Sequence, residues 1–358
     1  MRDIPVAKPI IDRKDIKAVA RVMKSGGLAQ GPQVASFEDK FSELVDGRNC
    51  VAVNSGTSAL HLALLSLGIG PGDEVIVPSF TFAATANSVA LTGAKPVFVD
   101  IDPVTYNIDP TLIESVITKN TKAIQVVHLY GLPADMNSIL AIAQKHNLLV
   151  VEDAAQAHLA SIDGKPVGSF GDAAAFSFYP TKNMTSGEGG MIVLKNPEHA
   201  RLCKLLRNQG MEKRYQNEVV GFNLRMTDIH AAIGISQLKK VHNWTRVRQE
   251  NAHFLNEKIS SVVTPFVPEG YTHVFHQYTV RVRKHRDTFS AKLTELGIGN
   301  SVYYPTQVHK LPSFDLVLEL KHTADATMQV LSLPVHPSLS KKDLNRIADA
   351  VNRVGESL

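Results

Sequence analysis

From about residue 50 to residue 195, short runs of apolar, often β-branched residues alternate with longer segments in which apolar residues recur at helical spacing. This alternation is typical of repeated β-α units, which build a mostly parallel sheet flanked by helices. The runs predict seven strands, at residues 50–53, 74–77, 96–99, 123–127, 148–151, 173–176 and 191–194. The sequence therefore predicts an α/β fold around a mostly parallel seven-stranded sheet.

Apolar periodicity also predicts the helices and changes in the last third of the chain. Residues 57–67 carry apolar side chains at spacings of three and four, and a glycine follows them, which is typical of an amphipathic helix and its end. A long helix is predicted over residues 228–258. Beyond it the pattern predicts one strand and two helices, at residues 278–282, 288–296 and 341–354. We therefore expect a large domain over residues 1–240, including an N-terminal arm, and a smaller α+β domain over residues 241–358.

Composition and charge narrow the class of protein. The 358 residues exceed the roughly 250–300 that one hydrophobic core organises, in agreement with two domains. The 38 basic and 34 acidic side chains are interspersed, so no basic block indicates a nucleic-acid partner. No apolar run approaches the roughly 20 residues of a membrane span and no signal-peptide pattern opens the chain, so we expect no membrane association and a cytoplasmic location. Cys50 and Cys203 lie in apolar or amphipathic surroundings and are predicted to be buried free thiols.

Candidate chemistry begins at Asp153, which follows the apolar run 148–151. Ligands of parallel α/β sheets bind outside the carboxyl ends of the strands, and Asp153 falls at such an end. The alternative is that Asp153 caps a following helix. On its own this residue does not decide between the two.

Lys182 lies 29 residues further on, in a loop that follows another apolar run and continues into residues 186–190. If the two strands are neighbours, Lys182 lies beside Asp153, and partial burial would make its amine a nucleophile. The alternative is an ordinary exposed loop lysine, as most lysines are.

A third element is the segment 54–60, in which a strand end passes through Gly56 into a helix that begins with Thr57 and Ser58. Free N–H groups at a helix N-terminus, together with hydroxyl groups, form a phosphate cradle, although a simple N-cap has the same sequence pattern. No Walker lysine follows, so a phosphate monoester fits better than a nucleoside triphosphate.

A phosphate cradle, a carboxylate and a lysine at strand ends together match the requirements of pyridoxal phosphate. The lysine can form an imine with the cofactor's aldehyde, and the carboxylate can keep the pyridine nitrogen protonated so that the ring withdraws electrons. We assign no metal site.

At these same residues the sequence resembles the DegT/StrS-type nucleotide-sugar aminotransferases, pyridoxal-phosphate enzymes of fold type I. The resemblance covers nearly the whole chain, and its strongest motifs are residues 54–60, 151–158, 176–190, 221–228 and 304–309. It implies that Lys182 forms the Schiff base, that Asp153 pairs with the pyridine nitrogen and that Gln156 bonds near the ring's 3-oxygen. It further implies that the phosphate is held by Thr57, Ser58 and Ser177.

Three more roles follow only from the resemblance. Phe82 matches an aromatic residue that stacks on the ring, although the pattern alone also fits a core residue. Asn223 matches an asparagine that reaches the phosphate of the partner subunit in a homodimer, although a turn asparagine has the same pattern. His309 matches a histidine near the sugar-nucleotide site, whereas His128, His158 and His276 are predicted to be structural. One departure is Leu159, where the family commonly has glycine, which puts the detailed shape of the pocket in doubt.

The resemblance implies an amino-group transfer from L-glutamate to a nucleotide-linked keto-sugar. We expect a 4-keto-6-deoxyhexose as acceptor, because residues 185–190 resemble the loop of the 4-aminotransferases, with a 3-keto sugar or an inosose as alternatives. A sugar 3-dehydratase carries histidine in place of the Schiff-base lysine, so Lys182 argues against that activity. A non-catalytic regulator is disfavoured by the intact set of Asp153, Gln156, Ser177 and Lys182.

Overall fold

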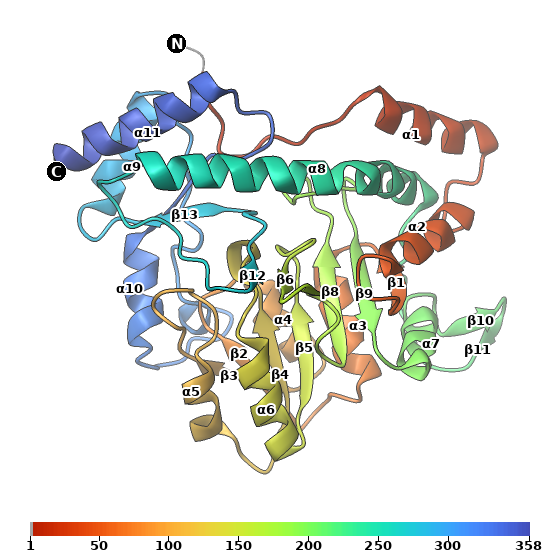
Figure 1. Ribbon diagram of the computed structural model, residues 1–358. Helices are drawn as coiled ribbons and strands as arrows, with labels where there is room; N and C mark the ends of the chain where they lie inside the picture. Colours follow the sequence, from red (N-terminus) through yellow and green to blue (C-terminus); the bar gives the residue numbers. More distant parts are fainter. Residues whose placement is uncertain (1–2) are drawn as a thin grey trace.

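The computed structural model describes residues 3–358 and is built around one twisted sheet (Figure 1). All seven predicted strands are present, and their ends differ from the prediction by no more than two residues. In spatial order they are β1 (Asn49–Val53), β9 (Gly190–Leu194), β8 (Ala173–Ser177), β5 (Leu149–Asp153), β4 (Thr121–Val127), β2 (Glu74–Pro78) and β3 (Lys95–Val99). β9 alone runs in the opposite direction to the other six strands. The predicted α/β fold with a mostly parallel sheet is confirmed.

Helices cover both faces of the sheet, which is why its strands are apolar on both sides. One face packs against α3 (Gly56–Ser66), α4 (Ala84–Leu91) and α7 (Pro197–Leu206). The other face packs against α2 (Pro32–Ser42), α5 (Pro110–Ile113), α6 (Met136–His146) and α8 (Asp228–Lys258). The carboxyl ends of the parallel strands therefore form one edge between two helical layers.

Helix α8 joins the sheet to the C-terminal part of the chain and crosses the molecule in Figure 1. Its first residues pack against α1 (Arg13–Ser25) and α2, and Ala252 and Leu255 near its end belong to a separate C-terminal core. That core is built from β13 (Tyr278–Arg281), β14 (Val330–Leu333), α9 (Arg286–Glu295) and α11 (Lys341–Glu356). The strand and helices predicted from residue 278 onward are confirmed.

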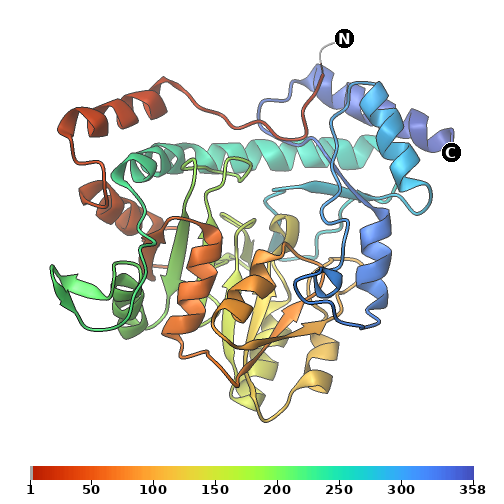
Figure 2. The ribbon, with the colours of Figure 1, turned by 180° about the vertical axis from the view of Figure 1, so that it is seen from behind.

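The expected division of the chain at residue 240 falls inside α8, so it stays a prediction. Segments from each side of residue 240 pack against the core on the other side. Ile4 pairs with Ile298 and lies in the C-terminal core, and Figure 2 shows the N-terminal segment running beside α8 toward α1. In the opposite direction, the segment before α10 (Lys321–Gln329) packs back onto the large sheet through Val308.

The remaining elements are short. They are η1 (Glu114–Val116), η2 (Leu129–Gly131), η3 (Val308–Lys310), the β10–β11 hairpin (Met211–Lys213 and Gln216–Asn217), and a small sheet of β6 (Ser161–Ile162), β7 (Lys165–Pro166) and β12 (Tyr271–Thr272). Within residues 3–358, no helix is both long and apolar enough to cross a bilayer. Cys50 and Cys203 are buried free thiols, as predicted.

Leu159, which departs from the family pattern, has a backbone conformation that suits glycine. Its φ of 71° lies in the left-handed region, while its half-buried side chain packs against the core between the sheet and α2. The backbone conformation costs about 1–2 kcal/mol for a residue with a Cβ. The side chain's packing offsets part of that cost.

We predict that Leu159→Gly is more stable than Leu159→Ala by about 1 kcal/mol, because only glycine relieves the positive φ while both lose the packing. Urea unfolding of the two variants measures the difference. Leu140, half-buried in the helical backbone of α6, is the matched control. There the alanine variant should be the more stable one, by about 1 kcal/mol. If the alanine variant is the more stable one at both positions, the strain at Leu159 is contradicted.

Candidate active site

One cavity of about 440 Å³ opens at the carboxyl ends of β1, β8, β5 and β4. Its volume lies in the range of small-molecule and cofactor sites. All three groups of residues singled out in the sequence reach its wall, because parallel strands present their carboxyl ends at one edge of the sheet. The predicted residues in the wall are Gly56, Thr57, Phe82, Asp153, Gln156, Ser177 and Lys182. The fold thus brings together segments that lie 126 positions apart in the chain, from Gly56 to Lys182 (182 minus 56).

Asp153 is the last residue of β5, and its carboxylate is buried at the floor of the cavity. The Thr85 hydroxyl donates to Oδ2 over 2.7 Å, and the backbone N–H of Ala155 donates to Oδ1 over 3.2 Å. Burial raises the pKa of Asp153, and these two hydrogen bonds oppose the rise. No helix follows β5 directly, so the interpretation of Asp153 as a helix cap is wrong.

Lys182 lies in the loop after β8, which pairs in parallel with β5, so the neighbouring strands required by the sequence argument are present. Its half-buried side chain lines the cavity. Burial lowers the pKa of Lys182 to about 8, and the negative charge of Asp153 partly opposes this. Lys182 is therefore not an ordinary surface lysine, since an appreciable fraction of its amine is neutral and nucleophilic near neutral pH.

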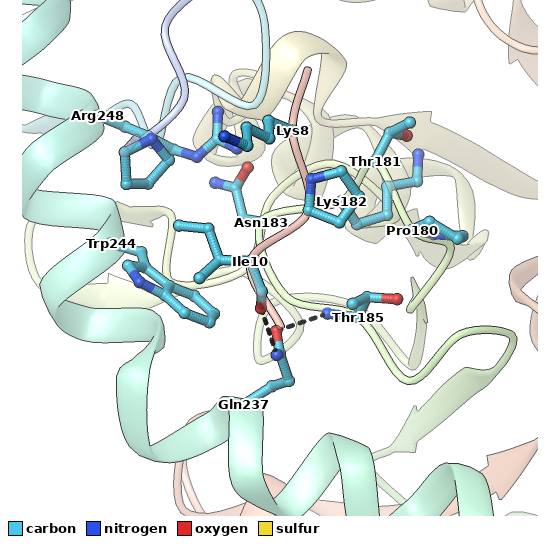
Figure 3. Close-up of a pocket in the computed structure, with 12 residues that line it drawn as sticks. Lys8, Ile10, Pro180, Thr181, Lys182, Asn183, Thr185, Gln237, Trp244 and Arg248 are labelled. Carbon is cyan, nitrogen blue, oxygen red and sulfur yellow. Dashed lines mark hydrogen bonds between the residues drawn. The ribbon is translucent and has the colours of Figure 1, made fainter. Parts of the chain in front are cut away.

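The loop that carries Lys182 is held from several sides. The Thr185 hydroxyl donates to the carbonyl of Phe178 over 2.8 Å, and the Asn183 amide donates to the carbonyl of Val274 over 3.1 Å. Figure 3 shows Gln237 of α8 between Thr185 and Ile10: it accepts from the Thr185 N–H and donates to the Ile10 carbonyl. The N-terminal segment and α8 thus hold the lysine loop from behind.

At the phosphate cradle predicted at the start of α3, the serine residues do not have the roles that the sequence predicts. Ser55 is the N-cap, and its hydroxyl accepts from the Ser58 N–H over 3.1 Å. The Ser58 hydroxyl donates to Asn54 over 2.7 Å, and Ser58 is not in the cavity wall. The helix does have a serine N-cap, but that residue is Ser55, so the interpretation of Thr57 or Ser58 as the N-cap is wrong.

Gly56 allows the two sides of this corner to meet. A Cβ at Gly56 would lie 2.8 Å from the Cβ of Ser177, at the end of β8. The corner thus combines the N-terminus of α3 with the hydroxyl groups of Thr57 and Ser177. Such an arrangement suits a phosphate group, because the helix N-terminus supplies N–H donors and a favourable dipole.

Gln156 is fixed at both ends of its amide. Its Oε1 accepts from the Tyr130 N–H over 2.7 Å, and its Nε2 donates to the Tyr304 hydroxyl over 2.9 Å. Tyr304 also faces Phe82, with ring centroids 6.0 Å apart. Phe82 is 60% exposed at the cavity wall, so the interpretation of Phe82 as a core residue is wrong.

Two predicted site residues lie outside the cavity wall of this chain. Asn223 is exposed and forms a backbone bridge with Asn208. His309 is fully buried: its Nδ1 lies 2.6 Å from the Ser79 hydroxyl, and its Nε2 lies 3.2 Å from the Leu318 carbonyl. The structure therefore does not place His309 beside the cavity, and its role toward a substrate stays a prediction.

The histidines predicted to be structural divide into two groups. His128 lies 3.1 Å from Glu152 and accepts from the Ala134 N–H, and His158 is buried among phenylalanine rings. His276, by contrast, lines the cavity.

Several residues of the wall or its support have no role in the sequence-based prediction. They are Ser55, Thr81, Thr85, Glu188, Gln277, Tyr303 and Tyr304. The threonines on either side of Phe82 and the position of Tyr304 at the start of the motif 304–309 are the signals that could have found three of them.

The fold and these side chains define the class of fold-type I pyridoxal-phosphate enzymes. The residues present fit the cofactor: a helix N-terminus with hydroxyl groups, a buried carboxylate, and a lysine whose amine is partly neutral. Residues 9–352 match the DegT/DnrJ/EryC1/StrS aminotransferase family, and the chain belongs to this family. It is a pyridoxal-phosphate-dependent sugar aminotransferase.

Similar proteins span nearly the full chain. A pleiotropic regulatory protein of Geobacillus stearothermophilus is 42% identical, with 94% of this chain and 93% of the relative covered. The dTDP-3-amino-3,6-dideoxy-alpha-D-galactopyranose transaminase of Aneurinibacillus thermoaerophilus is 42% identical, with 96% of each chain covered. The crystal structure of S. venezuelae DesV superposes with a TM-score of 0.94 at 38% identity, covering 99% of this chain and 100% of DesV.

We predict that Asp153→Asn lowers the pKa of the Lys182 amine below about 8, because it removes the negative charge that favours the ammonium form. In cofactor-free protein, acetylation of Lys182 at pH 7 should then be severalfold faster. Peptide mass spectrometry across a pH series measures the midpoint. The exposed Asp163→Asn is the control and should leave it unchanged. A midpoint that rises or stays in place in Asp153→Asn would rule out the coupling.

Proposed function

We propose that this protein transfers an amino group from L-glutamate to a nucleotide-linked 4-keto-6-deoxyhexose, in amino-sugar biosynthesis for a surface polysaccharide or a secondary metabolite. The observation that carries the proposal is the meeting of Asp153, at the end of β5, with Lys182, in the loop after the neighbouring strand β8, beside the N-terminus of α3. The transaminase relative, which is named for a dTDP-linked sugar, supports a nucleotide-linked acceptor.

The proposed roles follow from the position of each side chain. Bound pyridoxal phosphate would supply an aldehyde that captures amines and a ring that withdraws electrons from the reacting carbon. Asp153 would hold a proton at the pyridine nitrogen, and Gln156 would orient the ring through the amide hydrogen that Tyr304 leaves free. Thr57, Ser177 and the α3 N-terminus would hold the phosphate.

Lys182 has two roles in this proposal. Its amine is the covalent anchor, and once an amino-acid donor displaces it, the same amine removes and returns the proton at the substrate carbon. A base works best when its pKa lies near the working pH, and burial brings the pKa of Lys182 to about 8. The lowered pKa therefore suits both roles.

The position of the keto group is the finer part of the proposal. Residues 185–190 resemble the loop of 4-aminotransferases, which supports C4. The name of the Aneurinibacillus relative instead supports C3 as an alternative, and an inosose acceptor is a further one. A regulator that binds the cofactor without turnover is disfavoured by membership of the aminotransferase family, although one relative is named as a regulatory protein.

We predict that 2-oxoglutarate is released from L-glutamate in the presence of a nucleotide-linked 4-keto-6-deoxyhexose, and more slowly with the 3-keto isomer. Lys182→Ala should reduce the rate at least about a thousandfold, because anchor and proton carrier are lost together. Lys195→Ala, an exposed lysine just after β9, is the control and should keep the wild-type rate.

The results separate the candidates. Faster release with the 3-keto sugar would move the assignment from C4 to C3. Cofactor binding without release from any keto-sugar or inosose would favour the regulator. Wild-type turnover by Lys182→Ala would overturn the proposed role of this lysine.

We further propose a homodimer in which Asn223 of one subunit binds the phosphate in the other subunit's site. Its exposure, away from the cavity of its own chain, supports this arrangement. Asn223→Asp should weaken phosphate binding, since it places a negative charge against the phosphate.

Mixing inactive Lys182→Ala with Asn223→Asp subunits tests the arrangement. A mixed dimer would contain one site with neither defect, so random mixing should restore activity at about one quarter of all sites. Native mass spectrometry, with one variant labelled with nitrogen-15, confirms that subunits have exchanged. If exchange occurs and no activity returns, Asn223 does not act across the interface.

A further inference from the structure

A second, smaller pocket lies behind the lysine loop, away from the part of the main cavity formed by Phe82 and Asp153. It has a volume of about 20 Å³, enough for one or two water-sized species. The N-terminal segment, the loop 180–185 and α8 enclose it, as Figure 3 shows. Of its lining residues, the proposed reaction uses only Lys182.

The charges around the pocket are all of one sign. Lys8, Lys182 and Arg248 line it, and no carboxylate of the described chain does. In Figure 3 the side chains of Arg248 and Lys8 extend toward one another at one end of the pocket. Two cations placed in this way repel each other unless an anion lies between them.

Arg248 is the clearest case of a positive charge without a counter-charge, because its side chain is buried and the residue is only 6% exposed. It takes part in no ion pair within residues 3–358; its Nη1 donates to the carbonyl of Phe275 over 3.1 Å, while its buried Nε has no partner. Burial lowers the pKa of Arg248 to about 10, so the group remains cationic at neutral pH. A buried charge normally has a counter-charge, and a buried N–H normally has an acceptor.

We propose that this pocket binds a small monovalent inorganic anion of the size of chloride. The Arg248 Nε–H donates to it, and the Lys8 ammonium closes the outer side. The volume favours a monatomic ion, because a phosphate or a carboxylate ligand needs more room than one or two water-sized species.

The other polar groups of the pocket agree with this assignment. The Thr185 N–H donates to the side-chain oxygen of Gln237, and the side-chain nitrogen of Gln237 donates to the Ile10 carbonyl. These groups therefore already have partners. The Asn183 Oδ1 is buried without a partner and needs a donor. The Lys8 ammonium or one water bound beside the anion supplies that donor.

Bromide, which replaces chloride and can be located by anomalous scattering, tests the site directly. Crystals of the holoenzyme soaked in sodium bromide should show an anomalous peak between Arg248 and Lys8. Crystals of Lys8→Gln should show a peak of much lower occupancy. Absence of a peak in the wild-type pocket, which is the result expected if water alone fills it, would overturn the proposal.

A solution measurement complements the crystals. In this measurement chloride replaces gluconate at constant sodium concentration, and the thermal midpoint of unfolding of the holoenzyme is followed. A ligand that binds only the folded state raises this midpoint. The two salts also act generally on protein surfaces, so the comparison is between variants. Lys8→Gln should raise the chloride concentration needed for half of the effect severalfold, whereas Lys119→Gln, an exposed lysine before β4, should behave as the wild type. Equal chloride responses of Lys8→Gln and the wild type would contradict the site.

Discussion

The parallel pairing of β5 with β8 is the constraint on which the active site depends. It places Asp153 at the end of one strand beside the loop of Lys182 at the end of the next. The third component, the α3 N-terminus, reaches the same corner because Gly56 lets the helix approach Ser177 closely. Residues from distant parts of the chain thus meet through strand order and one missing Cβ.

Burial then gives these groups their chemistry. It raises the pKa of Asp153 and lowers that of Lys182, because each charged form loses hydration. The two groups partly restore each other's charge, and the Thr85 hydroxyl adds to this at Asp153. The proposed anion pocket lies behind the same loop, where Arg248 is a buried cation without a carboxylate partner among the described residues.

The C-terminal and N-terminal segments also contribute contacts to the active site. Tyr304 returns from the C-terminal part of the chain to orient Gln156, and Gln237 of α8 joins the lysine loop to the N-terminal segment. The large sheet therefore does not form the site alone. The sequence signals at Tyr304 and Thr85 are local, whereas the contacts of these residues with Gln156 and Asp153 are long-range, so their roles became visible only in the folded chain.

The sequence by itself determined the seven strands, the main helices and the residues that end the strands, because hydrophobic periodicity and turn residues act locally. It also singled out Asp153 and Lys182 by their positions after apolar runs, whereas the expected role of Gln156 came from the family resemblance. Tertiary structure alone decided that Ser55 rather than Ser58 lies in the cavity wall, that Phe82 is exposed and that His309 is buried outside that wall. These outcomes depend on which surfaces pack together, and burial is a property of the folded chain that no single segment specifies.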